Sequence, residues 1–147
     1  MYEDAVEELV PLYNDLKDNY RYIYDCGYAL QICKRYHESN EILKEGAKIS
    51  SDPMFYNIIG KNLEAMGFYE EAEQAYLPAH YMVPQRLYPL PLLMRMHIRL
   101  GYNNEAMRYG RMILDKPVNE RHRTMLRLQS DTRHCVDSLS SIILQTR

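Results

Sequence analysis

Apolar and small side chains recur along the chain with the spacing of paired amphipathic helices. Ile59 and Leu63 are four residues apart, and so are Ala72 and Tyr76. Side chains four residues apart lie on one face of an α-helix, so each pair marks the buried face of one helix. The same register, carried along the chain, predicts helices over residues 20–34, 37–50, 53–66, 69–82, 88–100 and 103–115.

The helix pair is one copy of a unit that repeats along the chain. Gly67 and Gly101 are 34 residues apart, and Gly27 and Gly60 are 33 apart. A period of this length is typical of helical repeat proteins, in which each pair packs against the next. The predicted fold class is therefore all-α: a solenoid of antiparallel helix pairs, wound into a right-handed superhelix.

The repeat also explains where small residues stand. Gly60 and Ala72 are small because the two helices of a pair must approach closely where those residues meet, while large side chains such as Tyr76 fill the space on either side. In the third pair Met94 takes the place of the glycine and Gly110 that of the large residue, which predicts a complementary exchange of bulk. The structural signature of the repeat comprises Gly27, Tyr56, Ile59, Gly60, Leu63, Gly67, Ala72, Tyr76, Ala79, Pro84, Gly101 and Ala106.

Glycine and proline mark the predicted helix ends. Gly67 can adopt the left-handed conformation that ends a first helix, and Pro84 cannot continue a second one. We expect Ala79 to face the first helix of the following unit.

The register divides the chain into five segments of one structural domain. Tyr2, Ala5, Leu9 and Leu12 match second-helix positions, so the chain starts within a repeat and we expect it to belong to a longer protein. After the repeats, an apolar rhythm at Met125, Leu128, Cys135, Val136, Leu139, Ile142 and Ile143 predicts a capping helix that frays beyond about Ser140. The segments are 1–18 (second helix of a truncated repeat), 19–52, 53–86 and 87–118 (three repeats, the last degenerate), and 119–147 (capping helix and tail).

These residues resemble a known repeat family. Tyr56-x2-Ile59-Gly60-x2-Leu63, Ala72-x3-Tyr76 and Pro84 are similar to the tetratricopeptide pattern W-x2-L-G-x2-Y, A-x3-F, P. More narrowly, residues 72–118, with the AHYMVPQRLYPL segment and the ILDKPV ending, resemble the C-terminal repeat domain of bacterial, Bacteroides-type O-antigen ligase and polymerase membrane proteins.

The narrower resemblance implies a role and a place. The chain would be the extramembrane tail of a protein of surface polysaccharide assembly, on the periplasmic face of the inner membrane and preceded by a membrane domain. The alternative is a free-standing cytoplasmic adaptor unrelated to glycans. Either way the expected role is a non-catalytic scaffold that binds a protein or peptide.

Composition narrows the classes of partner. The 147 residues are 46% hydrophobic, enough for a substantial core, and the formal net charge of -2 argues against nucleic acid as a partner. The longest nearly apolar run, residues 87–94, is too short to span a bilayer. Cys26, Cys33 and Cys135 have no framework spacing, which favours free thiols over a disulfide and fixes no compartment.

Catalytic, cofactor and metal sites are not predicted. The glycines follow the repeat instead of a phosphate-binding loop, and no nucleophile stands in a recognisable arrangement with a base. Cys33 and His37 are four residues apart, but a zinc site needs about four ligands and no second pair has suitable spacing. We expect no enzyme activity, cofactor or metal in this chain.

The first helix of each pair would line the inner groove of the solenoid. Aromatic and cationic side chains there would favour an extended acidic partner. The alternative is that the tyrosines pack between helices and the cations are ordinary solvated residues. The candidate groove residues are Tyr24, Tyr28, Asn57, Lys61, Arg95 and Arg99.

Two further expectations concern the first pair and the chain ends. Tyr20, Tyr22, Tyr24 and Tyr28 cluster on one helix, where they would stack on sugar rings or, as we favour, fill the core. Uncovered solenoid ends would allow a homodimer.

Overall fold

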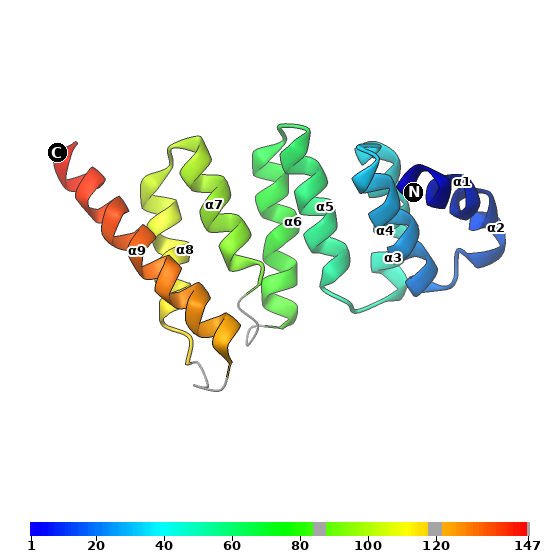
Figure 1. Ribbon diagram of the computed structural model, residues 1–147. Helices are drawn as coiled ribbons and strands as arrows, with labels where there is room; N and C mark the ends of the chain where they lie inside the picture. Colours follow the sequence, from blue (N-terminus) through cyan, green and yellow to red (C-terminus); the bar gives the residue numbers. More distant parts are fainter. Residues whose placement is uncertain (84–87, 118–121, 147) are drawn as a thin grey trace. The chain divides into compact units, whose positions relative to one another are not determined.

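The computed structural model describes residues 1–83, 88–117 and 122–146, and these residues form helices joined by short connections (Figure 1). The chain divides into two compact units, Met1–Val83 and Pro84–Arg147. Each unit is described by itself, so the single domain and the handedness of the superhelix stay predictions.

The first unit consists of a short N-terminal helical segment followed by two antiparallel helix pairs. Helix α3 packs on α4, α4 on α5, and α5 on α6, while α1 packs on α3 (Figure 1). The predicted pairs are confirmed, and α6 has the predicted bounds. The elements are α1 (Tyr2–Leu9), the 3-10 helix η1 (Val10–Leu12), α2 (Tyr13–Leu16), α3 (Tyr20–Ile32), α4 (Tyr36–Ile49), α5 (Met54–Ala65) and α6 (Tyr69–Met82).

The second unit holds the third pair and a long final helix. Helix α7 (Leu90–Leu100) packs on α8 (Asn103–Leu114), and α9 (Arg123–Gln145) packs on α8, which it crosses obliquely (Figure 1). The degenerate third repeat therefore still forms a helix pair.

A small residue faces a large one inside each pair of the first unit. A Cβ built on Gly27 would lie 2.4 Å from Leu43 Cδ2, and one on Gly60 would lie 2.5 Å from Tyr76 Cε1. Both large side chains are fully buried. Each glycine thus provides the space that one side chain of the partner helix fills. The close approach expected at Gly60 is found, but the side chain nearest to Gly60 is Tyr76 and not Ala72.

The third pair exchanges the two roles. A Cβ on Gly110 of α8 would lie 3.2 Å from Met94 Sδ of α7, so here the large residue stands on the first helix. The same Cβ would lie 2.6 Å from Val136 Cγ2 of α9. The predicted exchange of bulk is confirmed, and Gly110 also allows the close approach of α9.

Left-handed residues end the first helix of all three pairs. Gly67 has φ +85° and Gly101 has φ +78°, as expected for glycines that follow a helix. Lys34 occupies the corresponding position of the first pair, with φ +60°. The sequence pattern missed this turn, because lysine gives no signal of a left-handed conformation.

Replacing Lys34 with glycine should stabilise the protein. A non-glycine residue in the left-handed region costs roughly 1 kcal/mol, and glycine removes that cost while it adds entropy to the unfolded chain. The Lys34 side chain is exposed and its backbone N–H already bonds the Gln31 carbonyl, so no other contact is lost. We expect Lys34→Gly to raise the free energy of unfolding by about 0.5 kcal/mol in urea titrations. Lys34→Ala, which keeps the strain, should give no such gain.

The opening segment is not the single second helix expected over residues 1–18. It breaks into α1, η1 and α2, with Pro11 in the 3-10 turn, whereas α6 continues through Pro78. The buried side chain of α1 is Val6, 3% exposed, while Tyr2 and Leu12 of the expected face are exposed. The Tyr22 hydroxyl holds this segment on α3 by donating a hydrogen bond of 2.6 Å to the Leu9 carbonyl oxygen.

The final helix packs as a cap on α8, but its face differs in part from the predicted one. Thr132 and Leu139 are its buried residues, and Ile142, which the apolar rhythm had included, is exposed. The helix continues to Gln145, past the predicted fraying point at Ser140. The Ser140 hydroxyl donates to the Val136 carbonyl oxygen within the helix.

Most of the repeat signature lies in the core. Pro84 falls outside the described residues. Gly27, Ile59, Gly60, Ala72, Tyr76, Ala79 and Ala106 are buried, and Tyr56 and Leu63 are half-buried.

Candidate functional site

The six candidate groove residues divide between the two units. Tyr24 and Tyr28 lie on α3 and Asn57 and Lys61 on α5, all in the first unit, so α3 and α5 share one candidate face. Arg95 and Arg99 lie on α7 in the second unit. The candidate residues therefore form two separate sets, one on α3 and α5 and one on α7.

Two tyrosines form a stack on the candidate face of the first unit. The rings of Tyr24 and Tyr28 are nearly parallel, with centroids 6.5 Å apart, and Tyr24 also meets the buried Phe55 edge-on at 5.9 Å. Phe55 thus fixes Tyr24 in place, and Tyr24 supports Tyr28, which remains 40% exposed. Of the two interpretations, core packing fits Tyr24, and a surface aromatic fits Tyr28.

A hollow of about 270 Å³ lies beside this stack, where α3 and α5 begin. Tyr20, Arg21 and Tyr24 line it from α3, and Asp52 and Met54 from the start of α5. The Asp52 carboxylate already accepts a hydrogen bond of 2.9 Å from the Met54 N–H. The hollow offers aromatic rings and one guanidinium to a ligand.

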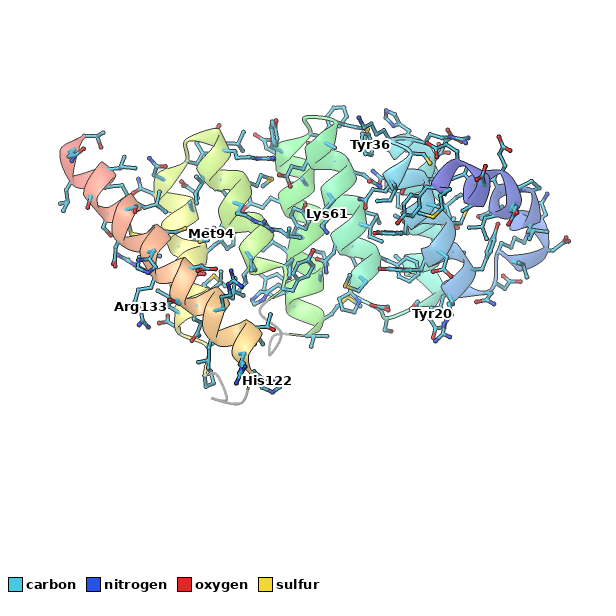
Figure 2. The ribbon with its side chains drawn as sticks, viewed as in Figure 1. Tyr20, Tyr36, Lys61, Met94, His122 and Arg133 are labelled. Atoms are coloured by element: carbon cyan, nitrogen blue, oxygen red, sulfur yellow. The ribbon has the colours of Figure 1, made fainter. Side chains whose placement is uncertain are left out.

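The two candidate residues of α5 differ in exposure. Lys61 is exposed, and Figure 2 labels it on this helix. Asn57, expected on the accessible groove, is only 2% exposed, and its Nδ2 lies 3.6 Å from Met54 Sδ. Asn57 therefore packs in the layer below the surface. It stands at the register position that Tyr24 holds on α3, but its side chain is buried.

The arginines of α7 are both exposed. Arg95 Nε donates to the Pro91 carbonyl oxygen one turn earlier, at 3.4 Å. Arg99 follows one turn later on the same helix. Together they form a cationic stripe on the first helix of the third pair.

A buried polar network ties the candidate face to the core. Asn62, which is fully buried on α5, donates hydrogen bonds of 2.8 Å to Ser39 Oγ and to Asn40 Oδ1 on α4. Its own Oδ1 accepts 2.8 Å from Gln31 Nε2 on α3, and Ser39 donates 2.7 Å to the Gly27 carbonyl oxygen. The network therefore joins three helices and fixes α3 beside α5. The sequence gives no signal of this network, since polar residues within an amphipathic pattern are typical of surface positions.

The tyrosine cluster of α3 has members with different roles. Tyr20 is exposed at the start of the helix, where Figure 2 labels it, and Tyr22 is buried against α1. Burial and the neighbouring Cys26 raise the pKa of Tyr22 to about 12, so its hydroxyl keeps its proton and its hydrogen bond at neutral pH.

Burial affects the chemistry of one of the three cysteines. All three thiols are free, and burial raises the pKa of Cys26, which disfavours the nucleophilic thiolate. Over the described ranges, His, Cys, Asp and Glu side chains nowhere gather in threes that could hold a metal ion. Likewise, the described helices include none that is long and apolar enough to cross a membrane.

Comparisons with known proteins bear on the fold. No protein-family model and no curated protein matches the chain. Among solved structures, the chain is similar to that titled "Crystal structure of MamA", with a TM-score of 0.70, 15% identity, and coverage of 95% of this chain and 83% of the other. A second, "Crystal structure of MamA protein", gives a TM-score of 0.69 at 15% identity, with 95% and 78% covered. The chain therefore has the all-helical, tetratricopeptide-like fold that its repeat predicts.

Proposed function

We propose that the protein is a non-catalytic scaffold that binds a segment of another protein on the face shared by α3 and α5. The tetratricopeptide-like fold supports a scaffold role in general, since such helix pairs present extended surfaces. The observation that carries this particular face is the supported, exposed ring of Tyr28 beside the hollow at Tyr24.

The chemistry of the face favours an extended and acidic segment. Tyr28 supplies an aromatic surface, and Arg21 and Lys61 supply exposed cations on the two helices. Asp52 is the carboxylate of the hollow, and it is engaged in a hydrogen bond to the start of α5. Charge-assisted hydrogen bonds from the cations would hold carboxylates of the partner, and the Tyr28 ring would stack on its aromatic side chains. The stripe of Arg95 and Arg99 on α7 would serve the same chemistry in the second unit.

Substitutions on this face should weaken binding of an acidic peptide. A fluorescent, extended peptide of alternating glutamate and tyrosine would be titrated against the whole chain. We expect Tyr28→Ala and Lys61→Glu each to raise the Kd about tenfold, which corresponds to about 1.4 kcal/mol. Tyr69→Ala, on the exposed start of α6 in the same unit, is the matched control and should leave the Kd unchanged. Equal Kd values for Tyr28→Ala and the unaltered chain would remove the proposed face.

The finer hypothesis is that the chain forms the periplasmic tail of an O-antigen ligase or polymerase-like protein. It is supported by the resemblance of residues 72–118, and its alternative is a free-standing cytoplasmic adaptor. The native reading frame distinguishes them: the tail requires an encoded series of membrane-spanning segments upstream, and the adaptor requires none.

A further inference from the structure

A second groove lies in the other unit, between α8 and the C-terminal end of α9. It has a volume of about 610 Å³. Helix α9 lies close to α8 at Gly110, where the absence of a side chain leaves space for Val136. The groove opens farther along α9, toward the C-terminal end of that helix. None of the candidate groove residues of the sequence lines it.

The lining of α8 has the spacing of a helix face that another helix would cover. The residues recur at intervals of three and four along the helix, which is the pattern of a single stripe. From α9 the groove takes Ser140, Ile143 and Leu144. The stripe consists of Asn104, Met107, Arg108, Arg111, Met112 and Asp115.

Four of the side chains that line the groove are apolar. Met107 and Met112 on α8 face the same groove as Ile143 and Leu144 on α9, and Leu144 is 68% exposed. Methionine fills irregular gaps, which suits a surface that receives apolar side chains of a partner. An exposed leucine at the rim would gain burial when a partner helix lies in the groove.

The lining of the groove has a net positive charge. Arg108 and Arg111 are exposed three residues apart on α8, and no ion pair recorded between described residues includes either of them. Arg108 lies over the Tyr109 ring at 5.1 Å, and its Nη2 donates a 3.5 Å hydrogen bond to the Tyr109 hydroxyl. A guanidinium has five N–H donors, so this one bond does not exhaust its capacity for an acceptor. Asp115 is the one carboxylate of the lining against these two arginines, so the net positive charge complements an acidic flank.

We propose that this groove binds one amphipathic helix of a partner protein, with its apolar side against Met107, Met112 and Leu144 and its acidic flank against Arg108 and Arg111. A second copy of this chain is a poorer fit. Its acidic amphipathic helix, α1, already buries Val6 on α3 and so lacks a free apolar side. The proposal concerns residues separate from those of the α3 and α5 face, so either proposal can fail without the other.

The test is a titration of the whole chain with a labelled 18-residue peptide, followed by fluorescence anisotropy. The probe carries leucine at helical spacing and glutamate along one flank, and a second probe has lysine in place of glutamate. We expect the acidic probe to bind, and Leu144→Glu and Arg111→Glu each to raise its Kd about tenfold or more. Methyl resonances of Met107 and Met112 should shift on binding, while that of Met82, on α6 and outside the lining of the hollow in the other unit, should not.

Both matched controls lie on α9. Leu126→Glu and Arg133→Glu make the same changes at exposed positions of α9 outside the groove, and Figure 2 labels Arg133. Their Kd values should stay within twofold of the original. Absence of binding, equal binding of the lysine probe, or equal loss in the controls would overturn the proposal. Self-association that Leu144→Glu abolishes, without peptide binding, would assign the groove to a second copy and overturn the proposed occupant.

Discussion

Gly60→Met should destabilise the protein strongly, and the double variant with Tyr76→Gly should lose less stability than the sum of the two single losses. Even a Cβ at Gly60 would lie 2.5 Å from the Tyr76 ring. The ring cannot move aside easily, because it is fully buried and its hydroxyl donates a 2.9 Å hydrogen bond to Glu64 Oε2. Overpacking of this kind costs about 3 kcal/mol, and removal of a buried aromatic ring about 4 kcal/mol.

The double variant imitates the third pair, where Met94 meets Gly110. If bulk and space are complementary, the two losses should not add, and a double-mutant cycle in urea should give a coupling of about 2 kcal/mol. Ala65→Met is the control, because it adds the same side chain at an exposed position of α5 and should change stability by less than about 0.5 kcal/mol. Strict additivity of Gly60→Met and Tyr76→Gly would show that the two positions do not share one space.

Asn62→Ala should produce the second large loss of stability. The substitution removes three hydrogen bonds and leaves Gln31, Ser39 and Asn40 without the partner that joins them. A buried polar group deprived of its partner costs about 1 to 3 kcal/mol, so a total loss of about 3 kcal/mol is expected. Chemical denaturation measures it.

Hydrogen exchange would locate the effect of Asn62→Ala. Amides where α3, α4 and α5 meet should lose protection more than amides of α7 and α8, which belong to the other unit. Asn14→Ala, at an exposed asparagine of α2, is the matched control and should be neutral. A neutral Asn62→Ala would mean that the network contributes nothing net to the fold.

The sequence predicts the helix pairs because close packing restricts which residue types can stand at particular positions. A glycine opposite a large side chain, as at Gly60 and Tyr76, recurs at a fixed period, and glycine after a helix, as at Gly67, marks its end. These are constraints on volume and backbone conformation, which restrict residue type. The left-handed Lys34 shows the limit, since the fold imposes the turn without the residue that suits it.

Features that depend on partners far along the chain were not predictable in the same way. The network around Asn62 involves residues up to 31 positions apart, and each member alone has the polarity of a surface residue. Asn57 stood on the expected groove by register but lies inward. The repeat predicts that α3 and α5 share a face. The hollow and the exposed ring of Tyr28 depend on the conformations of individual side chains, which the repeat does not specify.

The exchange of Met94 and Gly110 limits how the repeats could be shuffled. A chain that joined α5 to α8 would set Gly60 against Gly110 and leave a void, and one that joined α7 to α6 would crowd Met94 against Tyr76. A complete helix pair contains both the small and the large residue and could be transplanted as a unit, but a single helix could not. The heritable module of this chain is thus the hairpin, and duplications that begin at a first helix are the ones that would survive.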